Sequence, residues 1–222
     1  MPAMILAAGR GERLRPLTDT TPKPLIEAGG RSLIEHHLSA LANYGFTRIV
    51  INHAYLGAQI EARLGDGTQY GVHVIYSREG THALETGGGI HRALPLLGEE
   101  VFVIVNADIW TDFPFATLTP PRGLAHLVLA PNPPHHPRGD FALKDGIVSN
   151  EGAELYTYTG IAVLRAELFA SCTPGAFPLA PLLRTAITRG EVSGELYRGA
   201  WRDIGTPESL RALREWLGES AG

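Results

Sequence analysis

Residues 4–25 read Met4-Ile-Leu-Ala-Ala-Gly-Arg-Gly-Glu-Arg-Leu-Arg-Pro-Leu-Thr-Asp-Thr-Thr-Pro-Lys-Pro-Leu25. They begin as a short apolar strand and pass through two small residues into a loop opened by Gly9 and Gly11. Small residues let the main chain approach a ligand closely, and glycines allow the φ angles that align successive N–H groups. Arginine and lysine bind phosphate oxygens, and the loop carries Arg10, Arg13, Arg15 and Lys23. The stretch therefore predicts a polyphosphate-binding loop, with a surface turn of solvated arginines as the alternative.

Two familiar phosphate-binding signatures are absent here. A dinucleotide-binding fingerprint requires G-x-G-x-x-G, and no third glycine follows Gly11 at that spacing. A Walker A loop requires G-x-x-x-x-G-K-[ST], and that string does not occur. Three prolines, Pro16, Pro22 and Pro24, predict an extended rather than helical conformation for residues 16–25.

The composition indicates one globular domain. The chain has 222 residues, of which 44% are hydrophobic and 19% charged, and residues 1–222 form a single predicted domain with two halves that meet near residue 120. The net charge of −4 gives no general basic field for nucleic acid. No apolar run reaches the ~18 residues of a membrane span. Cys172 is the lone cysteine, which excludes an internal disulfide and suits a cytoplasmic protein.

The first half alternates strands and helices. Hydrophobic periodicity predicts strands at 4–6, 48–52, 72–76 and 101–105, and helices at 32–44, 56–64 and 90–97, the last with Gly87-Gly88-Gly89 at its N-terminus. Residues 101–105 are wholly apolar, as expected for a strand buried on both faces. This alternation predicts an α/β, Rossmann-like fold with a mostly parallel sheet and helices on both faces. Ligands of such sheets lie beyond the carboxyl ends of the strands, where the opening loop begins.

The second half is richer in strands. We expect strands at 125–130, 156–164 and 195–197, and a hairpin over 141–149 that turns at Asp145-Gly146. Helices are predicted at 179–189 and at 207–217, the latter capped by Thr206.

Two carboxylates are placed to hold a metal ion. Asp108 follows the most buried strand, and Asp203 precedes the last helix. Magnesium is typically held by one or two carboxylates together with water and substrate phosphates. The alternatives are an aspartate that caps a turn and an aspartate beside a helix N-cap.

The string from Leu6 to Leu25 resembles, without a gap, the signature of the sugar-nucleotide pyrophosphorylases, the nucleotidyltransferases that make NDP-sugars. The matching residues are Leu6-Ala7-Ala8-Gly9, Gly11, Arg13-Leu14, Pro16-Leu17-Thr18 and Pro22-Lys23-Pro24-Leu25. The resemblance implies in-line attack by a sugar 1-phosphate on the α-phosphorus of an NTP, with Mg²⁺ as cofactor. It assigns the catalytic roles to Arg13, Lys23, Asp108 and Asp203, and the metal to Asp108 and Asp203.

The same resemblance assigns the two substrates to different groups of residues. Residues 1–120 form the nucleotide-binding half, whose contacts are Leu6, Ala7, Ala8, Gly9, Gly11, Glu12, Arg13, Lys23, Glu85 and Gly87. Residues 121–222 form the sugar-phosphate-binding half, and the sugar-phosphate contacts are Asn106, Asp140, Thr159 and Gly160. Glu85 departs from the family pattern because glycine is usual there. His135 and His136 lie in a proline-rich loop, solvated or lining the acceptor pocket.

Several further segments resemble the subgroup of N-acetylmuramate-1-phosphate uridylyltransferases, which act in peptidoglycan recycling. These segments are Ile51–Ala54, Leu84–Gly87, Val105–Asn106, Arg138–Phe141, Thr159–Ile161 and Trp201–Thr206. The resemblance favours UTP and N-acetylmuramic acid 1-phosphate as substrates of a monomer or weak dimer that binds neither nucleic acid nor membrane. The alternatives are a mannose- or heptose-1-phosphate guanylyltransferase-like enzyme and a non-catalytic nucleotide-sugar sensor.

Overall fold

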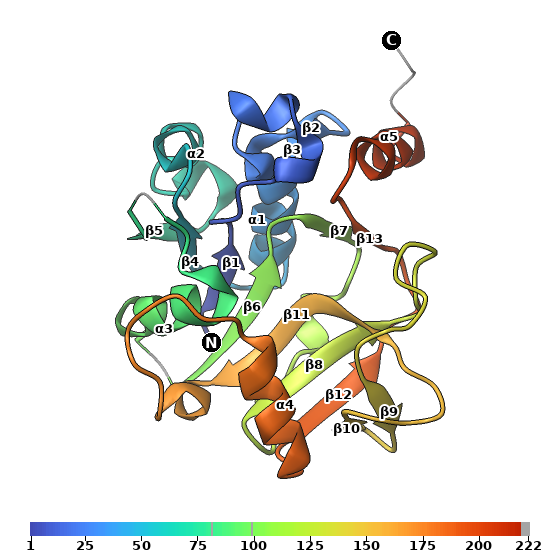
Figure 1. The fold of residues 1–222 in the computed structure, drawn as a ribbon. Coiled ribbons are helices and arrows are strands. Elements are labelled where there is room, and N and C mark those ends of the chain that lie inside the picture. The colour runs from blue at the N-terminus through green and yellow to red at the C-terminus, as the bar shows by residue number, and fades with distance from the viewer. Residues whose placement is uncertain (81, 99, 219–222) are drawn as a thin grey trace.

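A nine-stranded sheet forms the centre of the computed structural model, which describes residues 1–80, 82–98 and 100–218 (Figure 1). The order across the sheet is β5-β4-β1-β6-β11-β8-β12-β10-β9. Its strands are β1 (Ala3–Leu6), β4 (Arg48–His53), β5 (His73–Arg78), β6 (Val101–Asn106), β8 (Ala125–Ala130), β9 (Ala142–Lys144), β10 (Ile147–Ser149), β11 (Thr157–Arg165) and β12 (Val192–Leu196). The helices are α1 (Leu33–Asn43), α2 (Gly57–Leu64), α3 (Glu85–Leu97), α4 (Ala180–Thr188) and α5 (Pro207–Trp216).

The first half of the sheet is parallel, as predicted. Strands β5, β4, β1 and β6 pair in parallel register, so their carboxyl ends meet at one edge. Strand β11 joins the two halves because it runs antiparallel to both β6 and β8. Strand β12 is parallel to β8, and the hairpin β9–β10 completes the far edge.

The two faces of the sheet are covered by different helices (Figure 1). On β6, Val103 and Val105 pack in the core that also contains residues of α1 and α2. Phe102 and Ile104 point to the opposite core, shared with α3 and α4. All four of these side chains are fully buried, so the apolar run 101–105 is the central strand that its composition predicted.

Most predicted elements occur at the expected places. The turn at Asp145-Gly146 has φ angles of 53° and 77°, as a tight two-residue hairpin requires. Thr206 caps α5, and its side chain accepts a hydrogen bond from the Ser209 backbone N–H. Strand β12 begins at Val192 rather than at Glu195.

Two local predictions were wrong. Residues 16–25 are not extended throughout, because they form two short 3₁₀ helices, η2 (Leu17–Asp19) directly after Pro16 and η3 (Lys23–Leu25), which contains Pro24. A proline fits the first turn of a helix, where its missing N–H has no partner to lose. Helix α3 begins at Glu85, so Gly87, Gly88 and Gly89 lie inside it rather than at its start.

Two small antiparallel pairs lie outside the main sheet. They are β2 (Glu27–Ala28) with β3 (Arg31–Ser32), and β7 (Ile109–Thr111) with β13 (Trp201–Asp203). A third, smaller core joins them to α5 and to the opening loop. It consists of Leu14, Ile26, Ala28, Leu33, Ile204, Leu210 and Leu213.

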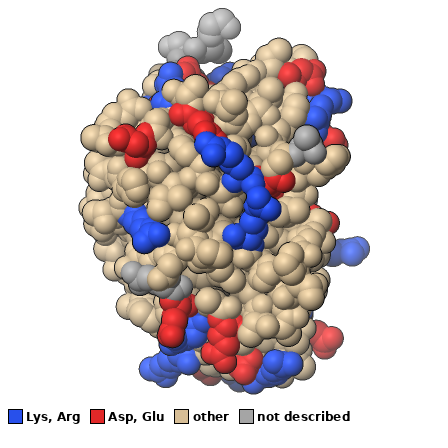
Figure 2. Space-filling model, turned by 90° about the vertical axis from the view of Figure 1, so that its left-hand side faces the viewer, with Lys and Arg blue, Asp and Glu red and all other residues tan. Residues whose placement is uncertain are grey.

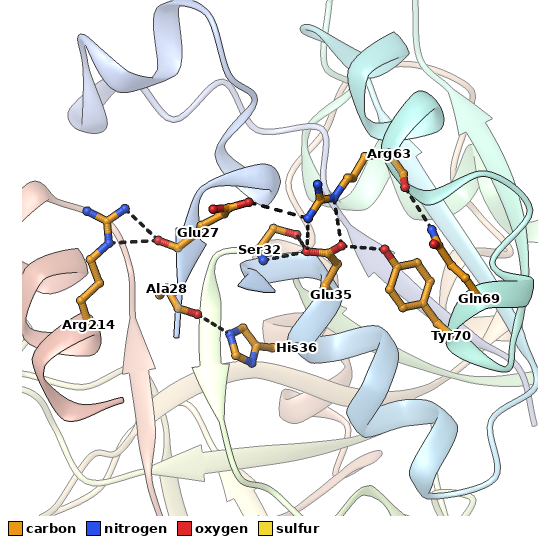
Figure 3. Close-up of polar contacts among 9 residues, drawn as sticks. All are labelled: Glu27, Ala28, Ser32, Glu35, His36, Arg63, Gln69, Tyr70 and Arg214. Carbon is orange, nitrogen blue, oxygen red and sulfur yellow. Dashed lines mark hydrogen bonds and ion pairs between the residues drawn. The ribbon is translucent and has the colours of Figure 1, made fainter. Parts of the chain in front are cut away.

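A buried carboxylate ties α1 to the segments around it (Figure 3). Glu35 is 6% exposed and accepts hydrogen bonds from the Arg63 guanidinium, the Tyr70 hydroxyl and the Ser32 backbone N–H. Burial alone raises the pKa of Glu35, but these hydrogen bonds outweigh it and lower the pKa to about 2. Alongside this cluster, Arg214 of α5 donates to the backbone carbonyl of Glu27.

The surface on the side of α2, β5 and α3 carries basic and acidic side chains close together, with wide uncharged areas between them (Figure 2). Among residues 1–80, 82–98 and 100–218, no helix has both the length and the apolar character that crossing a bilayer needs.

We expect Glu35→Gln to destabilise the fold by about 1–3 kcal/mol near pH 7, because the buried hydrogen-bond network loses its negative charge and one of its two acceptor oxygens. The folded-state pKa lies below the usual 4.5, so the carboxylate contributes stability above pH 4.5 that is lost as the pH falls toward 2. Urea denaturation from pH 7 to pH 3 measures both effects. Glu27→Gln is the control, because Glu27 lies 3.7 Å from the same arginine with an exposed side chain. Equal acid dependence in wild type and Glu35→Gln would contradict the assignment.

Candidate active site

The carboxyl ends of three neighbouring strands bring polar side chains together. Leu6, the last residue of β1, is paired in register with Asn52 on one side and Asn106 on the other. Immediately beyond it, Ala7 and Ala8 lead into the glycine- and arginine-rich loop. The predicted loop therefore does lie at the ligand-binding edge of the parallel sheet.

One hollow of about 190 Å³ opens over this edge. Six of the predicted nucleotide contacts line it: Leu6, Ala7, Ala8, Gly9, Lys23 and Glu85. Its remaining lining residues are Pro24, Asn52, Ala83, Thr86, Asn106, Ala107 and Asp108. The wall is mainly small side chains and main chain, a surface that lets a flat or phosphorylated ligand approach the backbone.

A buried amide–carboxylate pair supports the floor of this hollow. Asn52 is 2% exposed; its Oδ1 accepts from the Ala7 N–H at 3.0 Å, and its Nδ2 donates to Glu79 Oε1 at 2.6 Å. Glu79 Oε2 in turn accepts from the Leu84 N–H at 2.6 Å. These bonds fix the start of α3 relative to the end of β1. A Cβ at Gly89 would lie 2.5 Å from Glu79 Oε1, so only glycine lets α3 pack this closely.

Glu85 and the neighbouring glycines shape the entrance to α3. Glu85 has φ = 57°, a left-handed conformation that costs a residue with a side chain about 1–2 kcal/mol more than glycine. A glycine at this position, as the resemblance leads us to expect, would avoid that cost. A Cβ at Gly87 would lie 2.6 Å from the Phe177 ring, so only glycine leaves room for that ring. The Gly88 N–H donates to the Phe177 carbonyl. Gly87 therefore holds a neighbouring segment in place and does not line the hollow.

A second hollow of about 380 Å³ adjoins the first. Asn106 and Asp108 line both hollows. The other lining residues of the second are Arg13, Ile109, His135, His136, Thr157, Tyr158, Thr159, Trp201 and Asp203. Two ligands can therefore meet at the wall formed by Asn106 and Asp108.

Lys23 and Asp108 form an ion pair at this wall. Lys23 Nζ lies 2.7 Å from Asp108 Oδ2, although 85 residues separate the two in the chain. The lysine side chain is 8% exposed and the aspartate side chain 39% exposed. Gly11, with φ = 70°, makes room for the lysine stem, because a Cβ there would lie 2.9 Å from Lys23 Cβ. Gly11 thus positions Lys23 without lining either hollow.

Asp203 is brought next to Asp108 by the β7–β13 pair. Asp203 is in register with Ile109, and the Ile204 N–H donates to the Asp108 carbonyl at 2.8 Å. The Oδ2 atom of Asp203 lies 3.5 Å from His135 Nε2. A Cβ at Gly205 would lie 2.8 Å from the Arg13 guanidinium, so that arginine packs over the chain just after Asp203. Arg13 consequently lines the second hollow rather than the first.

Of the remaining predicted sugar-phosphate contacts, Thr159 lines the second hollow, whereas Gly160 and Asp140 do not. The Thr159 hydroxyl donates to the Val128 carbonyl. Gly160, at φ = 82°, lies in the irregular pairing of β11 with β8 and leaves space for the Asn106 amide, which a Cβ would approach to 2.6 Å. Asp140 stands behind the wall, where it accepts from the Tyr158 N–H and contacts His136. Glu12 lines neither hollow.

Sequence reasoning missed the structural part played by Asn52 and Glu79. A polar residue at the carboxyl end of a parallel strand is the signal that marks Asn52, as it marks Asn106. Glu79 carries no such signal, because its partner Asn52 is 27 residues away.

Two carboxylates that line the second hollow suit a hard cation. Asp108 lies in the turn between β6 and β7, and Asp203 ends β13, the strand that pairs with β7. In residues 1–80, 82–98 and 100–218, no three His, Cys, Asp or Glu side chains are grouped to enclose a metal by themselves. A cation here would need ligand oxygens from a substrate, as magnesium commonly takes.

His37 of α1 supports the segment that carries Asp108. Its Nε2 lies 2.8 Å from the Ile109 carbonyl oxygen, and the residue is 2% exposed. Burial lowers the pKa of His37 to about 4, so the neutral ring donates to that carbonyl.

Comparison with known proteins places these features in a family. The family model described as "Nucleotidyl transferase" matches residues 2–120. The N-acetylmuramate alpha-1-phosphate uridylyltransferase of Neisseria meningitidis is 51% identical over 98% of this chain and 99% of its own. The protein of the same name from Caulobacter vibrioides is 36% identical, over 98% and 97%. The crystal structure of HddC from Yersinia pseudotuberculosis complexed with GMP-PN has a TM-score of 0.80 at 19% identity, over 97% of this chain and 99% of that one, which shows the shared fold.

We expect the unfolding free energy to fall between pH 6.5 and pH 4 because of His37. Its folded-state pKa is below the usual 6.5, so the stability it contributes is complete above pH 6.5 and declines as the unfolded chain takes up the proton first. His37→Gln should flatten this part of the profile in urea denaturation. His73→Gln, which changes an exposed histidine of β5, is the control. An unchanged slope in His37→Gln would refute the assignment.

Proposed function

The chain belongs to the nucleotidyl transferase family, and from that premise we propose that it transfers a uridylyl group from UTP to N-acetyl-α-muramate 1-phosphate. The observation that carries the proposal is the pair of hollows that share Asn106 and Asp108. A group-transfer enzyme has to hold donor and acceptor on either side of the reacting atom. The first hollow is assigned to the nucleotide and the second to the sugar phosphate.

The reaction needs no protein nucleophile and no general base. A phosphate oxygen of the acceptor, already anionic, attacks the α-phosphorus of UTP. The new P–O bond forms as the bond from the α-phosphorus to the bridging oxygen of pyrophosphate breaks, and pyrophosphate leaves with that electron pair. The protein then contributes positioning and charge neutralisation.

The residues at the shared wall have the following proposed roles. The Lys23 ammonium has three N–H donors, so it can bind a phosphate oxygen while it contacts Asp108. Arg13, on the acceptor side near Asp203, supplies a planar fork for phosphate oxygens of the acceptor or of pyrophosphate. The main chain at Ala7, Ala8 and Gly9 offers close approach to the nucleotide.

Charge favours a divalent cation, which we propose to be Mg²⁺ held by Asp108 and Asp203. The two hollows are lined by three carboxylates, those of Asp108, Asp203 and Glu85, but by only two permanent cations, Lys23 and Arg13. The substrates add a triphosphate and a monophosphate to this surplus of negative charge. A divalent ion held there would supply positive charge to neutralise the phosphates. Asp108 and Asp203 would supply its protein ligands.

The choice of base and sugar rests on the named relatives, which act with uridylyl groups and N-acetylmuramate 1-phosphate. A guanylyltransferase on this fold is the alternative within the same chemistry, because a nucleotide base can be read largely through main-chain groups. A non-catalytic sensor is less well supported, since Arg13, Lys23, Asp108 and Asp203 are all present and border the hollows. We place the activity in the cytoplasm, in peptidoglycan recycling, and in a monomer or weak dimer.

Pyrophosphate release in a grid of four NTPs against four sugar 1-phosphates tests the function. The acceptors are the 1-phosphates of N-acetylmuramic acid, N-acetylglucosamine, mannose and glucose, each with Mg²⁺. We expect the strongest activity with UTP and N-acetylmuramic acid 1-phosphate. Preference for GTP and mannose 1-phosphate would retain the mechanism and replace the substrates. Nucleotide binding without turnover in any combination would favour the sensor.

Asp108→Asn should reduce kcat by at least ~100-fold while the melting temperature changes little, because the side-chain shape is kept and the charge that holds the cation is lost. EDTA should abolish wild-type turnover, and added Mg²⁺ should restore it. Asp145→Asn is the matched control, since Asp145 lies in the β9–β10 turn away from both hollows. Near-normal turnover of Asp108→Asn, or activity that persists in EDTA, would remove the metal role.

A further inference from the structure

The loop between β8 and β9 places two histidines in the acceptor hollow. His135 and His136 both line it, and they are the imidazoles that do so among the described residues. They stand in the sequence Pro131-Asn-Pro-Pro-His-His-Pro137, which has few backbone conformations available to it. The proposed chemistry of nucleotidyl transfer uses neither side chain.

The two imidazoles contact different carboxylates, that of Asp203 for His135 and that of Asp140 for His136. His135 Nε2 lies 3.5 Å from Asp203 Oδ2, at the end of the hollow proposed to hold the cation. His136 Nε2 lies 3.1 Å from Asp140 Oδ1, and Asp140 Oδ2 accepts from the Tyr158 N–H at 2.8 Å. Asp140 does not line the hollow, so it holds His136 from behind. The second nitrogen of the His136 ring is turned away from this carboxylate.

Asn132 fixes the rest of the loop. Its Nδ2 donates to the carbonyls of Pro137 and Leu155, and its Oδ1 accepts from the Thr157 hydroxyl at 2.8 Å. Gly139, at φ = 68°, allows this packing, because a Cβ there would lie 2.7 Å from Asn132 Oδ1. The loop therefore presents His136 in one orientation before any ligand arrives, which reduces the entropy cost of binding.

The proposed acceptor carries a group that such a side chain can recognise. N-acetylmuramic acid differs from N-acetylglucosamine only by a lactyl ether, which ends in a carboxylate. In the proposed function, Arg13 and the cation at Asp108 and Asp203 bind the phosphate of the acceptor. This second anionic group is attached at C3 of the ring rather than at C1, which carries the phosphate, and it needs a hydrogen-bond donor separate from those carboxylates. His136 meets this requirement because its own carboxylate partner, Asp140, lies outside the hollow.

We propose that His136, held by Asp140, donates a hydrogen bond to the carboxylate of the acceptor sugar and so selects lactyl-bearing over plain amino-sugar 1-phosphates. This inference rests on the proposed function and adds a specificity-determining residue to it. The Nε2 atom of His136 faces Asp140, and the other ring nitrogen, Nδ1, donates the hydrogen bond to the substrate. Asp140 is the positioning residue that sets the orientation of the ring.

The test compares N-acetylmuramic acid 1-phosphate with N-acetylglucosamine 1-phosphate in wild type and His136→Gln. N-acetylglucosamine 1-phosphate is followed as a substrate or, where its turnover is too slow, as a competitive inhibitor. The selectivity for the lactyl-bearing acceptor should fall about 10- to 100-fold in His136→Gln, the range expected for one charged hydrogen bond. The loss should appear as a higher KM at nearly constant kcat, and Asp140→Asn should reproduce it in weaker form.

His126→Gln is the matched control, because His126 is also paired with a carboxylate, that of Glu195, but lies outside the hollow. It should keep the wild-type selectivity. A wild type that prefers the lactyl-bearing acceptor, with the same preference in His136→Gln, would overturn this inference alone. An equal loss with both acceptors would also overturn it, since a structural defect does not distinguish the two sugars. A wild type that does not use the lactyl-bearing acceptor would overturn the proposed function together with the inference.

Discussion

The ion pair between Lys23 and Asp108 is the contact on which the site depends. It joins the opening loop to the end of the central strand across 85 residues, and the lysine side chain is nearly buried. The Asp108 carboxylate offsets part of the cost of taking a lysine ammonium out of bulk water, so the contact helps to hold the loop in this position. The same contact places a cation and a carboxylate at the wall between the two hollows. One interaction thus both positions the opening loop and places the charged groups of the site.

The third core makes this arrangement rigid. Leu14 of the opening loop and Ile204, which follows Asp203, are both fully buried in it with Leu210 and Leu213 of α5. The chain segments that carry Arg13 and Asp203 are consequently anchored to the same few apolar side chains. Helix α5 is far in sequence from the residues of the nucleotide hollow, yet through this core it helps to position Arg13 and Asp203. Removal of α5 would affect the site through this core rather than through direct contact with a ligand.

Much of the fold could be read from the sequence because the decisive signals are local. The apolar run 101–105 marks the central strand, and a carboxylate just beyond it marks the ligand edge, so Asp108 could be predicted as a site residue. Contacts between distant short segments could not be predicted. Strands β7 and β13 have three residues each, which is too few for a periodic pattern, and their pairing alone sets Asp203 beside Asp108. Placement of Arg13 on the acceptor side likewise depends on its packing over Gly205.

The resemblance motif also mixed residues that contact a ligand with residues that make such contact possible. Gly11 and Gly160 belong to the strings on which the family resemblance rests, but each leaves space for the side chain of another residue, Lys23 or Asn106. This difference in role is invisible in a one-dimensional pattern, because both kinds of residue tolerate little substitution. It also separates two functions in space. The sheet ends and the ion pair fix the atoms that react, whereas the proline-rich loop after β8 offers a preorganised side chain to the rest of the acceptor. Changes in that loop can therefore alter the sugar that is chosen without disturbing the phosphoryl chemistry at the wall.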